Sequence, residues 1–531
     1  MQRLTLLFLL SSLTANAQTL FPDDPLEFEP KPLPVKEIAK RKLSDYYDLL
    51  TNTLDTPGQL NRKEQRPIRA LAVNTLGEPM QGAWWVKRHY YKPMGLEELV
   101  TGPGKDHAPD PRGPWTVVGA KNEGITPGFV VLDAKEDLYF IKFDPLTNPE
   151  MATGADQVAI RLVYALGYHV PENYLVEFAK EMLVLGKDVT VADRLGRRRR
   201  MTDRDLTEIL LKVPKNGSGR YRATASRAIP GAGIGPYRYH GTRRDDPNDF
   251  VFHEHRRDLR GFAIVSAWIG HDDSRAINTY DALVEENGEK FIRHYILDLG
   301  STLGSGTQRA NSPRSGGEYL FGWKQSAVQL MSLGLAVPYW AKAHFPDLPS
   351  VGRFEFATFD PERWVPEYPN PAFHNRLPDD EFWAAKQIMS LGNEQIRAIV
   401  ETGQYSDPTA ADWLAQCLIQ RRDKIGRAFY KKVLPIDKFE IRDNQLVFED
   451  LSEKADFGAA GPYRIQWFQF DNGTEATSPI PGATTAVMPS PSGPYLVARI
   501  ASESRPRQLV DVTVRLEGSS SPTVVGIDRQ W

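Results

Sequence analysis

Two short polar motifs in the middle of the chain, at residues 270–278 and 298–300, constrain its fold more than any other feature. The first reads Gly-His-Asp-Asp-Ser-Arg-Ala-Ile-Asn and contains the pattern His-x-Asp-x-x-x-x-Asn, and the second reads Asp-Leu-Gly. Between them, the pair Asn287-Gly288 is a strong signal for a two-residue hairpin turn. The sequence therefore predicts a two-stranded ribbon whose base brings Asn278 close to Asp298.

The residue types in these motifs suit phosphoryl transfer. In that reaction a protein mainly positions groups: one carboxylate receives the proton of the acceptor hydroxyl, while an Asn and a second carboxylate hold metal ions. Asp273 is the candidate base and its neighbour Asp272 is the rival, although the spacing to Asn278 favours Asp273. Because hard cations prefer oxygen ligands, Asn278 and Asp298 are the candidate ligands of Mg²⁺, with Mn²⁺ as an alternative.

A candidate lysine for the nucleotide precedes these motifs. Three apolar runs separated by turn-rich pieces predict a strand meander, and a stretch with helical spacing follows them. These segments are residues 115–118, 129–132, 138–141 and 149–166. Lys142 ends the third run, where a lysine can bind the α and β phosphates of ATP. Asp156 in the helical stretch is the candidate acid that holds this lysine, and Glu150 is the alternative.

The connection between the first two runs, residues 119–128, is a candidate phosphate loop. It lacks the pattern Gly-x-Gly-x-x-Gly, but its glycines allow backbone amides to approach a phosphate. Lys121 and Gly124 are therefore candidate cofactor-binding residues, with a plain hairpin loop as the alternative interpretation.

Several later segments are expected to shape the site. Val176–Phe178 is the predicted hinge between two lobes, and the glycine-rich residues 225–236 are predicted to form a long loop that lines the cleft, with a structural insertion as the alternative. Residues 301–317 have the Gly and Ser content of a mobile lid. The triplet His253-Glu254-His255 invites a zinc interpretation, but it lacks the one-turn spacing of His-Glu-x-x-His. We interpret it as polar groups at the start of a helix.

On four segments the chain resembles a known family, the atypical HipA-like and CotH-like branch of the protein-kinase-like proteins, and especially exported bacterial members of uncharacterised role. The segments are Phe-Ile-Lys-Phe-Asp-Pro (140–145), Ala-Leu-Gly-Tyr-His-Val-Pro-Glu (165–172), residues 268–278 and residues 297–300. The resemblance covers about residues 110–310 and extends over the helices to about 435. It implies ATP, Mg²⁺ and a bilobal fold, but no particular acceptor.

The chain also departs from this family. Leu299 stands where Phe is usual, Asp156 stands where Glu is usual, and no Ala-Pro-Glu segment follows Gly300. The phosphate loop is unorthodox as well. These departures argue against ordinary Ser/Thr kinase regulation more than they argue against phosphotransfer.

The order of these patterns predicts the α+β fold class, as a bilobal protein-kinase-like fold followed by a C-terminal all-β, sandwich-like domain. After the motifs, helical spacing continues to about residue 432, and the pattern then changes to period two. The expected domains are a signal peptide at 1–17, an N-terminal extension with a helix at 18–109, a kinase-like N-lobe at 110–180, a helical C-lobe with insertions at 181–435 and a β-sandwich-like domain at 436–531.

The ends and the composition of the chain bear on its compartment and partners. Arg3, an apolar run and Ala15-Asn16-Ala17 have the order of a secretory signal peptide, so we expect a periplasmic or secreted protein. No later apolar run approaches the roughly 18 residues of a membrane span. The only cysteine, Cys417, excludes a disulfide framework. A net charge of −3 gives no basic excess for nucleic acid.

The sequence leaves two classes of function. The first is an exported ATP- and Mg²⁺-dependent phosphotransferase, an atypical kinase, with AMP transfer on the same fold as a variant. The second is a pseudokinase or a cell-envelope binding protein without catalysis. The complete set of Lys142, Asp273, Asn278 and Asp298 favours an enzyme. The acceptor, whether a protein, a sugar or a small molecule, stays open.

Overall fold

The apolar runs before Lys142 form consecutive antiparallel strands in the computed structural model, which describes residues 20–35, 37–58, 67–120, 128–192, 198–333, 335–516 and 521–531. The strands are β1 (Trp115–Ala120), β2 (Gly128–Leu132) and β3 (Leu138–Phe143), and β2 pairs with both neighbours. Val117, Val131 and Tyr139 are almost fully buried, because alternate residues of each strand face one core. The predicted meander is confirmed.

The chain divides into two units, each of which is described separately. Among the described residues, the large unit consists of those within 27–73 and 78–432, and the C-terminal unit of those within 20–26, 74–77 and 433–531. Both contain helices and strands, so the fold is a mixed α/β fold. None of the helices in the described ranges combines the length and the apolar character that crossing a membrane requires.

A six-stranded sheet organises the first part of the large unit. Its order is β4-β8-β3-β2-β1-β5, where β4 is Asn173–Phe178, β5 is Leu183–Leu185 and β8 is Tyr221–Arg227. Between β5 and β8 lie β6 (Thr190–Ala192), β7 (Arg198–Arg200) and α3 (Asp203–Leu210). Side chains from α3 and its flanks, including Val189, Leu206 and Leu210, pack into the same core as the sheet.

Two predictions about this region are wrong. The predicted hinge Val176–Phe178 lies inside β4, and the chain returns to the same sheet with β8 after the segment that contains β6, β7 and α3. The glycine-rich residues 225–236 do not form one long loop, because they comprise the end of β8 and strand β9 (Ala232–Gly235). The reason is that β4 pairs with β8 across an insertion, with Phe178 opposite Tyr221, and a local pattern does not reveal such a pairing.

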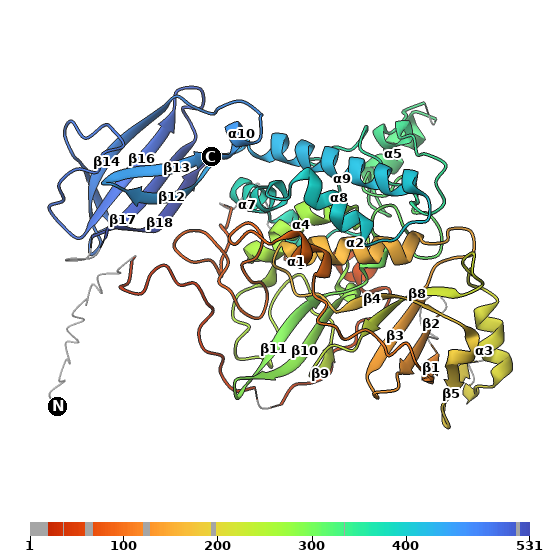
Figure 1. The fold of residues 1–531 in the computed structure, drawn as a ribbon. Helices are drawn as coiled ribbons and strands as arrows, with labels where there is room; N and C mark the ends of the chain where they lie inside the picture. Colours follow the sequence, from red (N-terminus) through yellow and green to blue (C-terminus); the bar gives the residue numbers. More distant parts are fainter. Residues whose placement is uncertain are drawn as a thin grey trace, which may run out of the picture. The chain divides into compact units, whose positions relative to one another are not determined.

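Helix α2 (Met151–Ala165) runs along this sheet and contacts β3, β4 and β8 on one side and α8 (Asn393–Glu401) on the other (Figure 1). Of its 15 residues, 13 are buried, including Asp156 and Gln157. Burying a carboxylate is costly unless it is paired or hydrogen-bonded, so Asp156 marks a position with a specific role. The helix ends at Ala165, and Gly167 follows with a φ of 99°, close to the predicted end.

The predicted ribbon is present. Strands β10 (Thr279–Glu286) and β11 (Glu289–Ile296) pair along their whole length, and β9 adds to the other edge of β10. Asn287 and Gly288 both have a positive φ, of 53° and 78°, as the two-residue hairpin turn requires.

Helix α4 (Arg257–Ile269) is the centre of the helical part of the large unit, and all of its residues are buried. It contacts α6 (Pro371–His374), α7 (Pro378–Met389) and α9 (Pro408–Phe429). The remaining helices are α1 (Leu96–Thr101) and α5 (Trp323–Met331), and a π-helical turn spans Asp48–Asp55. The helical spacing predicted for residues 379–432 is confirmed by α7, α8 and α9.

The C-terminal unit contains the predicted period-two strands. A five-stranded antiparallel sheet has the order β15-β14-β16-β17-β18. Its strands are β14 (Tyr463–Asp471), β15 (Ala476–Pro479), β16 (Tyr495–Ser502), β17 (Leu509–Arg515) and β18 (Thr523–Gln530). The hairpin β12 (Ile436–Arg442) and β13 (Gln445–Asp450) and the short helix α10 (Leu451–Lys454) precede it. Ile436 and Leu446 from the hairpin share one core with Trp467, Leu496 and Val512 from the larger sheet.

Candidate functional site

The two polar motifs meet at the base of the ribbon. Helix α4 ends at Gly270, whose φ of 67° is that of a left-handed C-cap. The segment then turns through Ala276–Asn278 into β10, and the amide of Leu297 donates to the carbonyl oxygen of Asn278 at 2.9 Å. The backbone next to Asp298 therefore pairs with Asn278, as the sequence predicted.

Lys142 reaches the second motif from the six-stranded sheet. Its Nζ donates to Oδ1 of Asp298 at 2.7 Å, although the two residues are 156 positions apart. Their side chains are 32 % and 28 % exposed, so solvent and a ligand can reach the pair. Asp298 has a left-handed φ of 56°. A non-glycine residue in this conformation is uncommon, and such strain concentrates at functional sites.

Asp156 lines the same pocket as Lys142 and Asp298. Burial raises the pKa of Asp156 to about 6, although Lys142 and a hydrogen bond of 2.7 Å from Asn173 Nδ2 act in the opposite direction. Burial lowers the pKa of Lys142, but Asp298 and Asp156 outweigh it, so this pKa is raised. The alternative acid, Glu150, accepts instead from the amide of Ser406 at 2.8 Å.

Asp273 is held by residues of its own segment. Asn278 Nδ2 donates to its carbonyl oxygen at 2.7 Å and to its Oδ2 at 2.9 Å. Arg275 Nε lies 2.5 Å from Oδ1 of Asp273. Burial raises the pKa of Asp273 to about 7; Arg275 opposes this shift, while Asp298 adds to it. A carboxylate with a pKa near neutrality is suited to general acid–base chemistry.

Asp272 faces a different environment from its neighbour. Its Oδ1 accepts from Asn311 Nδ2 at 2.9 Å, and its Oδ2 accepts from the hydroxyl of Ser315. Both oxygens are thus engaged by the loop after the second motif. Of the two rival acids, Asp273 is the one whose partners lie within the motif itself.

Two pockets lie next to each other at this site. The smaller one surrounds Lys142, Asp156 and Asp298, and the larger one, of about 580 Å³, lies beside Asp273. Thr307 lines both of them. This residue has a left-handed φ of 69°, which is unusual for a β-branched side chain. The larger pocket is mostly polar, and its charged lining residues are Asp272, Asp273, Arg275, Arg309, Arg314, Glu318 and Glu367.

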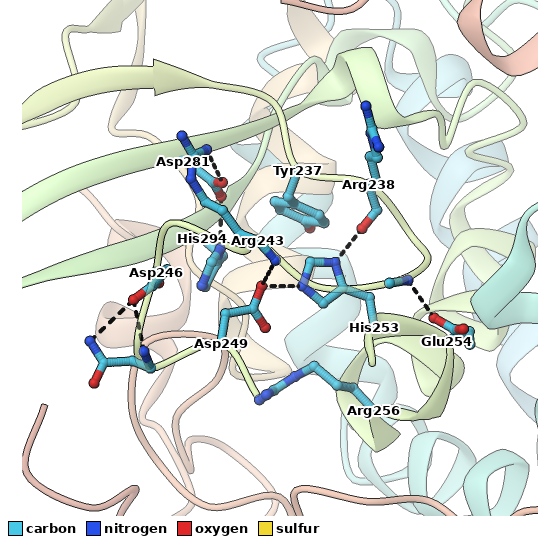
Figure 2. Close-up of polar contacts among 12 residues, drawn as sticks. Tyr237, Arg238, Arg243, Asp246, Asp249, His253, Glu254, Arg256, Asp281 and His294 are labelled. Atoms are coloured by element: carbon cyan, nitrogen blue, oxygen red, sulfur yellow. Dashed lines mark hydrogen bonds and ion pairs between the residues drawn. The ribbon is translucent and has the colours of Figure 1, made fainter. Parts of the chain in front are cut away.

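A buried polar cluster lies between the loop before α4 and the ribbon (Figure 2). His253 Nε2 contacts Oδ2 of Asp249 at 2.8 Å, and the amide of Arg243 donates to the same oxygen at 2.6 Å. His294 on β11 contacts Asp281 on β10 at 2.7 Å, and Arg243 Nη1 reaches Asp281 at 3.2 Å. The loop between β9 and α4 is thereby tied to the ribbon.

The same loop also touches the start of β10 directly. The amide of Tyr237 donates to the hydroxyl oxygen of Thr279 at 2.9 Å, one residue after Asn278. Trp84 stacks on the ring of His294 with the centroids 3.5 Å apart. These contacts hold the ribbon in place relative to α4. The first motif connects these two elements.

The remaining candidate residues are not among those that form this site in the described part of the chain. Lys121 and Gly124 lie outside the described residues. His255 contacts Arg260 at 2.8 Å, and Glu254 accepts from the amide of Gly241 at 2.7 Å, so the triplet with His253 is part of the support for α4. Within the described part of the chain, no group of three or more His, Cys, Asp or Glu side chains is arranged to hold a metal ion.

Three residues of the site were not predicted from the sequence. Arg275 pairs with Asp273, and Asn311 and Ser315 hold Asp272. Arg275 lies inside the first motif, so its position was a signal that could have been used. Asn311 and Ser315 lie in a Gly- and Ser-rich stretch in which no single residue stands out.

No family model matches the sequence, and no curated protein matches it either. Among solved structures, the chain is similar to the proinflammatory kinase CtkA of Helicobacter pylori. The TM-score is 0.31 and the identity is 12 %, and the match covers 62 % of this chain and 94 % of that one. The likeness is distant, so the proposed function is based on the geometry of the site.

Proposed function

We propose that this protein is an exported ATP- and Mg²⁺-dependent phosphotransferase of the atypical kinase type. One observation carries the proposal: Lys142 and Asp298, from segments 156 residues apart, form an ion pair of 2.7 Å beside the buried acid Asp156. A cation, a metal-binding carboxylate and a supporting acid in one pocket are the parts that phosphoryl transfer needs around the phosphates.

The donor set suits a magnesium ion. Asn278 and Asp298 offer oxygen atoms, and Asn278 uses its Nδ2 on Asp273, which leaves its Oδ1 for a cation. Mg²⁺ typically takes only one or two protein carboxylates together with substrate phosphates and water, so a larger acidic cluster is not required. When bound, the ion would neutralise charge on the β and γ phosphates. Mn²⁺ has the same ligand preference.

The side chains of the protein then have distinct roles. Lys142 binds the α and β phosphates, and Asp156 keeps the ammonium group in place. Asp273 orients the acceptor hydroxyl and receives its proton, while Asn278 and Arg275 fix the carboxylate of Asp273. The acceptor enters the polar pocket beside Asp273, and Thr307 marks the boundary between the acceptor and the nucleotide.

The finer features expected from the sequence belong to this proposal. They are the bilobal kinase-like fold, the sandwich-like C-terminal domain, the signal peptide at 1–17 and a periplasmic or secreted location. The six-stranded sheet with Lys142 and the helical part around α4 are consistent with two lobes.

Binding and turnover of ATP by the mature protein from Gln18 test the proposal. We expect Mg²⁺-dependent ATP binding in the parent, a loss of affinity of about tenfold or more in Lys142→Ala and Asp298→Ala, and no change in Lys290→Ala, which removes an exposed lysine of β11. Asp273→Ala should keep binding and lose about 10²- to 10⁴-fold in rate.

The position of the label in ATP distinguishes a kinase from an AMP transferase and from a protein without catalysis. Transfer from γ-labelled ATP indicates a kinase, and transfer from α-labelled ATP indicates AMP transfer. Binding without any transfer would favour a pseudokinase. An absence of nucleotide binding with both Mg²⁺ and Mn²⁺ would contradict the proposal and favour a cell-envelope binding protein.

A further inference from the structure

The loop that follows the Asp-Leu-Gly motif forms one wall of the polar pocket beside Asp273. Residues 306–312 and 314–316 all line this pocket. The loop contains no helix or longer strand, and its internal hydrogen bonds are those of turns, such as the bond of 3.0 Å from the amide of Gly306 to the carbonyl oxygen of Arg309. Where this wall of the pocket lies also depends on the contacts that the loop makes with the rest of the protein.

Asp272 anchors this loop through two side chains, beside Arg353, whose Nη1 donates to the carbonyl oxygen of Asn311 at 2.6 Å. Asn311 Nδ2 donates to its Oδ1 at 2.9 Å, the hydroxyl of Ser315 donates to its Oδ2, and Asn311 Nδ2 also lies 3.0 Å from the oxygen of Ser315. These three polar side chains close a small triangle between the motif and the loop. Asp272 is only 9 % exposed, so the loss of one partner would leave a buried carboxylate under-solvated.

The backbone of Asp272 holds a second wall of the same pocket. The amide of Glu367 donates to the carbonyl oxygen of Asp272 at 2.8 Å. Glu367 lines the pocket, and it is an electrostatic partner of Arg275, which in turn pairs with Asp273. One residue next to the proposed base thus contacts both of these segments, which are also joined directly where the amide of Val365 donates to the carbonyl oxygen of Gly316 at 3.1 Å.

We propose that Asp272 is a positioning residue that shapes the acceptor pocket through Asn311 and Ser315. It does not touch the reacting groups; it fixes the loop against which the acceptor lies while Asp273 receives the proton. The catalytic part of this inference rests on the proposed phosphotransfer, whereas the anchoring of the loop does not. The charge of Asp272 also predicts that a second anion at position 315 would push the loop away.

Hydrogen exchange of the nucleotide-free protein tests the anchoring. We expect amides of residues 305–316 to exchange about tenfold faster or more in Asp272→Ala, Ser315→Ala and Ser315→Asp than in the parent. Ser315→Thr keeps the hydroxyl and should restore slow exchange. Thr358→Val is the matched control, because it removes a hydroxyl that donates to the buried carboxylate of Glu355 at 2.7 Å outside this pocket.

ATP turnover with water or the protein itself as acceptor tests the positioning role. The rates are normalised to the concentration of protein that binds nucleotide. We expect kcat to fall about 10- to 100-fold in Ser315→Ala, while KM for Mg-ATP changes by less than about twofold. Ser315→Thr should restore kcat. A double variant, Asp272→Ala with Ser315→Ala, should be no worse than Asp272→Ala alone.

The outcomes separate this inference from the proposed function. Exchange in residues 305–316 that is the same in the parent, Asp272→Ala and Ser315→Ala would overturn the anchoring. A normal kcat in Ser315→Ala, or a KM for Mg-ATP that rises with the fall in kcat, would overturn the positioning role. A parent that binds no ATP would overturn the proposed function, and the exchange experiment would still decide whether Asp272 holds the loop.

Discussion

The protonation of His253 follows from the two acceptors that its ring faces. Nδ1 lies 2.5 Å from the carbonyl oxygen of Arg238, and Nε2 lies 2.8 Å from the carboxylate of Asp249. Neither partner can donate, so both ring nitrogens must carry protons. Burial lowers the pKa of His253, but Asp249 outweighs burial, and Arg256 only partly opposes it, so the pKa is raised. The side chain is a buried imidazolium.

His253→Gln should therefore be destabilising in a pH-dependent way. The folded pKa lies above the unfolded one of about 6.5, so the stabilisation is complete below about pH 6.5 and is lost as the pH rises through the folded pKa. We expect a loss of about 3–5 kcal/mol in the free energy of unfolding at pH 6, because the buried carboxylate of Asp249 loses its charged partner and keeps only the amide of Arg243. Urea unfolding between pH 6 and pH 9 should show the difference from the parent shrinking.

His344→Gln is the control for this experiment, because His344 is exposed. The free energy of unfolding of this variant should be close to that of the parent at every pH. A difference for His253→Gln that stays constant, or grows, between pH 6 and pH 9 would contradict the imidazolium assignment.

The contacts of single residues were predictable from the sequence only where a motif fixed them. Lys142, Asn278 and Asp298 were expected to share a site because the spacing of the motifs is specific, and the structure brings Lys142 onto Asp298. The partners of Asp272 lie 39 and 43 positions away in a loop without periodicity, so no pattern pointed to them. Whether these residues act on ATP stays a prediction.

At the level of elements, the glycine at the C-cap of α4 and the glycine in the turn of the ribbon differ in a testable way. Gly270 and Gly288 have similar φ values, of 67° and 78°. A Cβ on Gly270 would lie 3.2 Å from the ring of Phe354, whereas a Cβ on Gly288 would meet no atom within 4 Å. The cap of α4 is therefore both conformationally and sterically restricted, and the turn of the ribbon is restricted only conformationally.

Gly270→Ala should cost more stability than Gly288→Ala. We expect about 1–2 kcal/mol for the left-handed conformation at either position, and about 1–3 kcal/mol more at Gly270 because the ring of Phe354 must move. Urea denaturation of both variants measures the difference. Equal losses at the two positions would show that the backbone conformation alone decides the cost.

Helices and strands were predicted well where the periodic pattern of apolar residues extended over enough positions. The strands before Lys142 and the helices after residue 378 appear close to their expected positions, because their apolar residues face one core. The hinge was misplaced because β4 and β8 pair across an insertion, and period two looks the same in an inner and an edge strand. Strand β18 was not predicted, although it pairs with β17 along its length.

On the scale of the whole molecule, the two units bury separate apolar cores. Leu496 on β16 is fully buried in the core of the C-terminal unit. Leu162 on α2 is fully buried in the large unit. Each core is large enough for its unit to unfold as a cooperative block of its own.

Leu496→Ala and Leu162→Ala should each affect one unit. We expect two thermal transitions in calorimetry, with each substitution costing about 2–5 kcal/mol in one of them and leaving the other in place. The first variant serves as the control for the second. A single transition that shifts equally in both variants would show that the units unfold together.

The position of β8 in the six-stranded sheet has a consequence for how the chain is made. Tyr221–Arg227 fits between β3 and β4, although both of those strands precede it in the sequence. A nascent chain therefore presents two open strand edges from the time that Phe178 is synthesised until Tyr221 follows. Unpaired edges invite pairing with other chains. During the translation of the insertion between these two residues, a holding chaperone that covers these edges would therefore protect the chain from mispairing.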